Sequence, residues 1–116
     1  MEESAHVTAD YPRVRVSGGE IQGEIATWKG VPFGAPTGGK ARFRRPRPVR
    51  GWLGVLDCTR YQSPAPQPNY GLNDRLIGDE DCLHLDIVRP HTTEKLPVVV
   101  YFHGGSFLMG ASHQNM

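Results

Sequence analysis

The run from Val98 to Phe102, V-V-V-Y-F, is apolar at five consecutive positions. Successive side chains of a strand point to opposite faces of its sheet, so a strand with this sequence needs apolar cover on both faces. Strands of this kind are typical of the interior of an α/β sheet, where helices cover both faces. The run therefore predicts an α/β fold in which residues 98–102 form a central strand with a neighbour at each edge.

Length and composition limit what else the chain contains. Its 116 residues amount to at most one modest domain, and 14 glycines with 10 prolines favour turns and short strands over helices. No run of about 18 apolar residues is present, so we expect no transmembrane helix. The net charge of +1 gives no reason to expect a nucleic acid or an anionic membrane as partner.

The pattern along the chain predicts short strands joined by long loops. Alternating apolar and polar residues around a pair of glycines favour a small antiparallel hairpin or meander over 13–29. Alternation also predicts a half-buried strand over 83–89, and a short strand is expected over 52–55. Residues 60–80, with four proline and glycine breaks, are expected to form a surface loop, and residues 1–12 a flexible polar lead-in.

The predicted central strand runs into a turn, H-G-G-S, at residues 103–106. Chemistry at an ester carbonyl places negative charge on oxygen in the transition state, and backbone N–H groups at a sharp turn can stabilise that charge. Glycine suits such a turn, because it tolerates a positive φ and has no Cβ to keep the substrate away. Two interpretations follow: Gly104 and Gly105 simply turn the chain, or the turn binds an oxyanion.

A second block, E-D-C-L-H-L-D-I at residues 80–87, reads by itself as the solvated opening of a strand. Together with the turn it resembles the type-B carboxylesterase family, whose members carry E-D-C-L-x-L-[ND]-[VI] shortly before H-G-G-x-F. Further motifs similar to those of the family occur in order earlier in the chain. G-V-P-F-G-A-P at 30–36 looks like the family's K-G-I-P-Y-A-x-P, and A-R-F-R-R-P-R-P at 41–48 resembles its L-R-F-x-x-P-x-P. W-L-G-V at 52–55 resembles W-x-G-V, and P-Q at 66–67 matches the end of C-P-Q.

The resemblance implies that residues 13–116 are the N-terminal portion of an α/β-hydrolase domain. In that fold a small antiparallel hairpin region leads into the first strands of a large central sheet, which is incomplete in this chain. The implied activity is hydrolysis of a small-molecule carboxylic ester by acyl transfer through a serine, with no cofactor and no metal. No G-x-S-x-G is present, so the nucleophile, base and acid are expected outside this chain. The alternatives are a non-catalytic cholinesterase-like protein and an inactive truncated product.

By resemblance, the backbone N–H groups of Gly105 and Ser106 are two donors of the oxyanion hole, and Gly104 gives the loop its shape. Ser106 stands where family members carry Gly or Ala, and its hydroxyl is not read as a nucleophile. His103 belongs to the loop motif and is not the family's catalytic histidine. Because strand 98–102 would leave an apolar edge exposed, we expect the isolated chain to be unstable or partly molten.

The resemblance also implies an ion pair between Arg42 and Glu80, bidentate and partly buried, that ties an early loop to the strand at 83–89. Arg42 lies in a run of six basic residues with no acidic one, from Lys40 to Arg50. A short basic module that binds nucleic acid is the alternative interpretation of this run. Its two prolines and the near-neutral charge of the whole chain argue against that alternative.

The chain has two cysteines, Cys58 and Cys82, which we expect to be buried free thiols. Secreted members of the family join the Cys of C-P-Q to the Cys of E-D-C-L, but the first of these positions is Ala65 here. The N-terminus lacks the basic start and apolar run of a signal peptide. We therefore expect a cytoplasmic location, in a reducing compartment.

Overall fold

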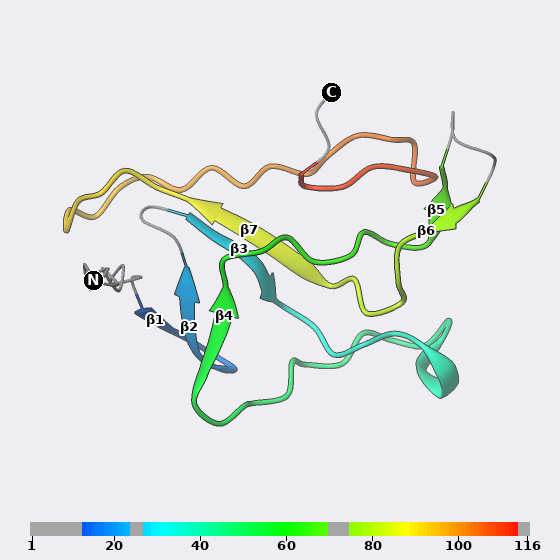
Figure 1. Cartoon of the computed structure of the whole chain (residues 1–116), viewed down its shortest axis with the longest axis horizontal. Coiled ribbons are helices and arrows are strands. Elements are labelled where there is room, and N and C mark those ends of the chain that lie inside the picture. Colours follow the sequence, from blue (N-terminus) through cyan, green and yellow to red (C-terminus); the bar gives the residue numbers. More distant parts are fainter. Residues whose placement is uncertain (1–12, 24–26, 70–74, 114–116) are drawn as a thin grey trace, which may run out of the picture.

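The computed structural model describes residues 13–23, 27–69 and 75–113, so the predicted lead-in at 1–12 lies outside the described residues. In these ranges there are seven strands and one short 3-10 helix, and no helix there is long and apolar enough to cross a bilayer. The elements are β1 (Arg13–Val16), β2 (Gly19–Gly23), β3 (Thr27–Pro32), η1 (Gly39–Ala41), β4 (Val55–Cys58), β5 (Gln67–Pro68), β6 (Leu76–Ile77) and β7 (His84–Val88). They form three small sheets, β1-β2-β4, β3-β7 and β5-β6, joined by long irregular segments (Figure 1).

The first two strands form the predicted antiparallel hairpin, with Val16 opposite Gly19 at its turn. The side chain of Trp52 covers this turn. Its indole N–H donates to the Glu20 carbonyl at 2.8 Å, and its backbone N–H donates to the Gly18 carbonyl at 3.0 Å. A Cβ on Gly18 would collide with the indole ring. Glycine at 18 is therefore needed for the close approach of the ring.

Strand β4 pairs with β2 in parallel, with Glu20 opposite Val55. The sequence predicted a strand at 52–55, three residues before the observed one. Gly54 has a φ of +76°, and Leu53 beside it is fully exposed. The backbone therefore becomes extended only from Val55 onward, and β4 ends at Cys58 in the core.

The core packs around Trp28 and Val31 of β3 and Cys58 of β4, all buried. Partly buried apolar side chains surround these three, among them Leu56 of β4 and Ile87 of β7. Strand β7 confirms the half-buried strand predicted over 83–89. It lies antiparallel beside β3 (Figure 1), and its Ile87 packs against the core.

The β3–β7 ladder shifts its register between Trp28 and Val31. At this bulge Gly30 has a φ of +69°, and its N–H donates to Oδ1 of Asp86 on β7 at 2.7 Å. A bulge leaves one residue without a ladder partner. The Asp86 carboxylate supplies the acceptor that the buried Gly30 N–H would otherwise lack.

Residues 60–80 are irregular over most of their described length, as predicted. The exception is a two-pair antiparallel ladder of β5 and β6, in which Gln67 lies opposite Ile77 and Pro68 opposite Leu76. The ladder fixes the position of Gln67, which alone is buried among the described residues of 60–80.

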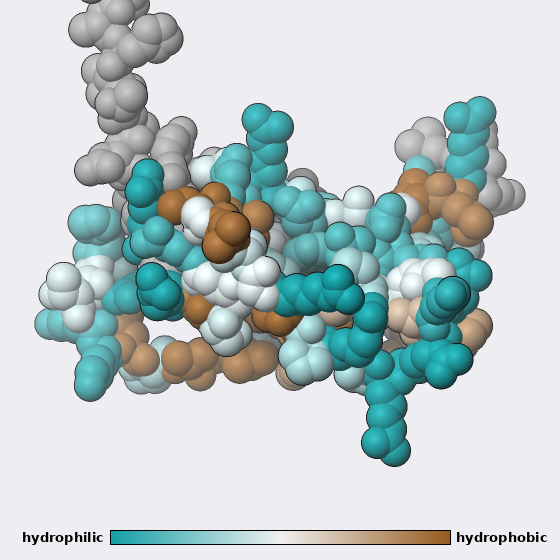
Figure 2. All heavy atoms as spheres, turned by 90° about the horizontal axis from the view of Figure 1, so that it is seen from below, coloured by the Kyte–Doolittle hydropathy of each residue, from teal (hydrophilic) through white to brown (hydrophobic). Residues whose placement is uncertain are grey.

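The prediction of a strand over 98–102 is wrong, because the run belongs to no strand of the structure (Figure 1). A strand exists through hydrogen bonds to a neighbour, and no described segment pairs with this one. Its five side chains are between 71% and 90% exposed. Figure 2 shows apolar side chains at several places on the surface of the molecule. The apolar cover that the run requires is therefore not among the described residues.

Candidate functional site

The turn after Phe102 folds into a compact loop at residues 103–110. The Gly105 carbonyl accepts hydrogen bonds from the N–H groups of Leu108 at 2.9 Å and Met109 at 3.2 Å. Gly105 has a φ of +121°, and a Cβ on it would collide with the Met109 carbonyl. Any side chain at position 105 is therefore excluded both by the backbone conformation and by the lack of space.

The next two residues adopt left-handed backbone conformations, with φ of +54° at Ser106 and +61° at Phe107. This conformation costs a residue with a Cβ about 1–2 kcal/mol, and it is concentrated at ligand-binding turns. Within the part of the chain that the structure describes, the N–H groups of Gly105 and Ser106 donate to no acceptor. Successive backbone N–H groups can bind an anionic oxygen where they converge on it.

Gly105 and Ser106 thus both lie in the loop, and position 105 is the one that requires glycine. Gly104, which was expected to shape the loop, has no positive φ, and a Cβ on it would meet nothing within 4 Å. Nδ1 of His103 lies 2.7 Å from the Gly104 carbonyl. Since a carbonyl only accepts, this nitrogen is the protonated one, and His103 is turned back onto its own loop.

The buried amide of Gln67, which in the sequence stands out only as part of the P-Q motif, holds the end of this loop. Gln67 is 4% exposed. Its Oε1 accepts from the Gly110 N–H at 2.8 Å, and its Nε2 donates to the carbonyls of Gly110 at 2.9 Å and Ala65 at 3.0 Å. The sequence signal was weak, because a glutamine between two prolines looks like any polar loop residue.

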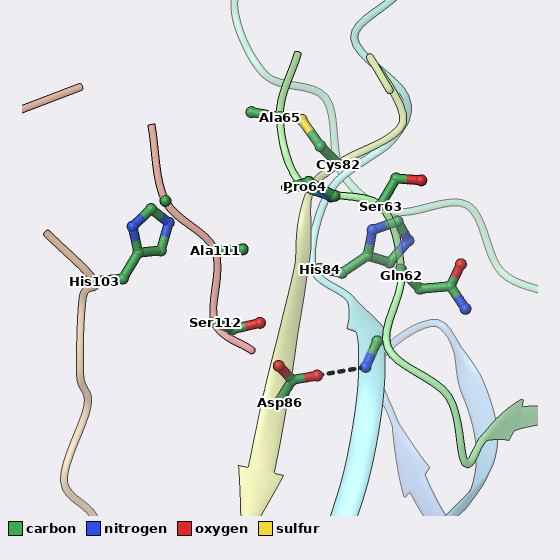
Figure 3. Close-up of a pocket in the computed structure, with 12 residues that line it drawn as sticks. Gln62, Ser63, Pro64, Ala65, Cys82, His84, Asp86, His103, Ala111 and Ser112 are labelled. Carbon is green, nitrogen blue, oxygen red and sulfur yellow. Dashed lines mark hydrogen bonds between the residues drawn. The ribbon is translucent and has the colours of Figure 1, made fainter. Parts of the chain in front are cut away.

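A cavity of about 120 Å³ lies between the loop, the segment around Ala65 and strand β7 (Figure 3). Two polar atoms on its β7 wall, Nδ1 of His84 and Oδ2 of Asp86, are buried without a hydrogen-bond partner among the described residues. A cavity of this size and polarity is suited to small polar molecules such as water. No group of three or more His, Cys, Asp or Glu side chains in the described ranges is placed to hold a metal ion.

Both cysteines are free thiols, as expected, but only Cys58 is buried as predicted. Cys58 is fully buried, and burial raises the pKa of its thiol to about 11. Burial also raises the pKa of Cys82, which is only partly buried. Cys82 and Ala65 line the same cavity (Figure 3). Ala65 stands where the family's secreted members carry the second cysteine, and its side chain cannot form a disulfide.

The Arg42 guanidinium and the Glu80 carboxylate form a bidentate pair, with Nε to Oε1 at 2.5 Å and Nη2 to Oε2 at 2.7 Å. The hydrogen bonds from Arg42 lower the pKa of Glu80, and Glu80 in turn raises the pKa of Arg42. The Arg42 side chain is 59% exposed and that of Glu80 33%, so the pair is more exposed than expected. Arg47 donates to the Pro36 carbonyl at 2.8 Å, so two cations of the basic run make contacts within the chain.

The sequence profile of the Carboxylesterase family matches residues 4–116. The para-nitrobenzyl esterase of Bacillus subtilis is 38% identical over 113 residues, which cover 93% of this chain and 22% of that protein. The phenmedipham hydrolase of Pseudarthrobacter oxydans is 36% identical over 104 residues, which cover 83% and 21%. The chain therefore spans about a fifth of the length of these relatives.

Solved structures match the fold as well. A PNB esterase structure superposes with a TM-score of 0.79 at 35% identity, covering 90% of this chain and 22% of the other. A Geobacillus stearothermophilus carboxylesterase gives a TM-score of 0.73 at 33% identity, covering 84% and 20%. The strands and loops described above thus correspond to the N-terminal region of an α/β-hydrolase.

Proposed function

Since the chain belongs to the carboxylesterase family, we propose that it is the part of a serine carboxylesterase that supplies the oxyanion-binding loop. The observation that carries the proposal is the pair of adjacent N–H groups on Gly105 and Ser106, which have no acceptor among the described residues. Left-handed φ values hold this pair in a turn. The proposed substrate is a small carboxylic ester, in line with the chemistry of the family.

In ester hydrolysis through a serine, the carbonyl oxygen becomes an oxyanion as the hydroxyl attacks. The N–H groups of Gly105 and Ser106 would donate to that oxyanion. Because the Gly105–Met109 turn already fixes their positions, little reorganisation is needed as the charge develops, and each such donor contributes about 10²–10³ in kcat. The hydroxyl of Ser106 has no part in this proposal.

The nucleophile, base and acid are proposed to lie in protein outside these 116 residues. No G-x-S-x-G occurs in the sequence, and the chain spans 22% of the Bacillus subtilis relative. The large central sheet of the fold is proposed to form together with that remaining protein. We therefore expect no ester hydrolysis by the 116 residues alone.

The test is a chimera in which this chain replaces the matching segment of the Bacillus subtilis para-nitrobenzyl esterase. The chimera joins the proposed loop to the catalytic residues of the host. We expect it to hydrolyse a para-nitrobenzyl ester, whereas the host without this segment should not. A chimera that folds cooperatively but does not hydrolyse the ester would contradict the proposal and favour a non-catalytic member of the family.

We also propose that the protein resides in the cytoplasm. The free thiols of Cys58 and Cys82 support this, as does Ala65, which cannot form a disulfide with Cys82. Fractionation of the native cells, followed by immunodetection, tests the location. Recovery of the protein from the secreted fraction would contradict it.

A further inference from the structure

We infer that Gln67 is a positioning residue for the proposed oxyanion donors, an inference that rests on the proposed function. Gln67 lies on β5, 43 residues before Gly110, whose peptide groups it binds. Its hydrogen bonds go to Gly110 and Ala65 and not to the donors themselves. Its effect on Gly105 and Ser106 must therefore pass through the loop.

The amide of Gln67 forms hydrogen bonds with both backbone polar groups of Gly110. Its Oε1 accepts from the Gly110 N–H and its Nε2 donates to the Gly110 carbonyl, at 2.8 and 2.9 Å. The second proton of Nε2 goes to the Ala65 carbonyl. A carboxamide is the side chain that offers an acceptor and two donors on one planar group. In a site where Gln67 is 4% exposed, these three bonds fix both the side chain and Gly110.

Gly110 passes this restraint to the start of the loop. It has a φ of +113°, and a Cβ on it would come within 2.6 Å of both the Gly104 carbonyl and Nδ1 of His103. Gly110 therefore packs directly against the Gly104 carbonyl. That carbonyl and the Gly105 N–H belong to one planar peptide group. The position of Gly110 thus sets the direction in which the first proposed donor points.

Two substitutions separate the parts of this contact. Gln67→Met keeps the length of the side chain and removes all of its hydrogen bonds to Gly110 and Ala65. Gln67→Glu keeps an acceptor but loses the donors, and an ionised carboxylate there would face two carbonyl oxygens. Gln62→Met is the matched control, because Gln62 is an exposed glutamine of the same segment that lines the cavity beside Gly110 without a hydrogen bond to it.

The kinetic test uses the chimera, which contains the whole 116-residue chain. We expect Gln67→Met to lower kcat per active serine about 10- to 100-fold with a nearly unchanged KM, since only the transition-state contact is displaced. Titration with a fluorophosphonate counts the active serines, and the unfolding midpoint monitors the fold. Gln62→Met should leave kcat and KM unchanged. An unchanged kcat per active serine in Gln67→Met would overturn the inference.

Hydrogen–deuterium exchange in the same proteins gives a readout that needs no activity. We expect Gln67→Met to speed exchange in the peptide covering 103–110, where the N–H groups of Leu108 and Met109 are protected by Gly105. Equal exchange in wild type, Gln67→Met and Gln62→Met would overturn the inference. An inactive wild-type chimera would count against the proposed function, while the exchange rates would still decide whether Gln67 holds the loop. Failure of both Gln67→Met and Gln67→Glu to fold would overturn the positioning role in favour of a purely structural one.

Discussion

Glu80 is bound to Arg42 through its side chain and to Thr37 through its backbone. Its carbonyl accepts from the Thr37 N–H at 3.1 Å and from the Thr37 hydroxyl at 2.6 Å, while its carboxylate receives the bidentate pair from Arg42. These contacts fasten the segment around η1 to the residues that lead into β7. Because the Arg42 side chain is exposed and that of Glu80 is partly exposed, the pair fixes geometry more than it adds stability.

The first prediction concerns Glu80→Gln, which removes the charge but leaves the backbone contacts to Thr37. Arg42 lowers the pKa of Glu80 in the folded state. The contribution of the pair is therefore present above about pH 4.3, the ordinary Glu pKa, and is lost as the pH falls through the lowered value. In the chimera we expect a small fall in the unfolding midpoint at pH 7 that becomes smaller as the pH falls through the lowered pKa of Glu80. Asp81→Asn, on an exposed neighbour, is the control, and a fall that stays the same size as the pH is lowered would contradict the prediction.

The second prediction concerns the bulge at Gly30, whose N–H is accepted by Asp86 Oδ1. Asp86→Ala leaves this buried N–H without an acceptor, at a cost of about 1–3 kcal/mol in the free energy of unfolding. Asp86→Asn retains an acceptor oxygen of the same reach and should cost much less. Urea unfolding of the chimera measures both, and equal losses in the two variants would contradict the role of this hydrogen bond.

The third prediction concerns the two thiols. At pH 8 a thiol with a pKa of about 11, as for Cys58, is almost entirely protonated, and its side chain is also fully buried. Cys82 is partly exposed, so a maleimide should label Cys82 first and Cys58 only when the protein unfolds. Mass spectrometry of digested, labelled chimera identifies the site. Faster labelling of Cys58 in the folded protein would contradict the packing of β4 described here.

Local patterns predicted the elements whose partners are close in sequence or whose alternation is strong. This group contains the β1–β2 hairpin, whose turn lies between Val16 and Gly19, and the strand at 84–88. Strand β4 was placed three residues too early, because its start depends on the left-handed conformation of Gly54. The sequence indicated that the run 98–102 needs cover on both faces and that the sheet is incomplete in this chain, but its pattern still predicted a strand where no described segment pairs with the run.

The site was predictable only in part, and for a related reason. The turn at 103–106 could be recognised from its glycines and from the family motifs around it. The role of Gln67 could not, because it depends on Gly110, which is 43 residues away and adds no local pattern. Nor did the sequence distinguish Gly104 from Gly105, although only Gly105 has a left-handed φ and no room for a Cβ.

The central claim is that backbone N–H groups of this chain stabilise an oxyanion, and the most direct test removes one of these groups. Nonsense suppression with an α-hydroxy acid at position 106 of the chimera replaces the Ser106 N–H by an ester oxygen. The same replacement at Phe107 removes an N–H that the proposal does not use. We predict that the change at 106 lowers kcat by about 10²–10³ while the change at 107 has little effect. Equal activities of the two ester-containing chimeras would contradict the claim.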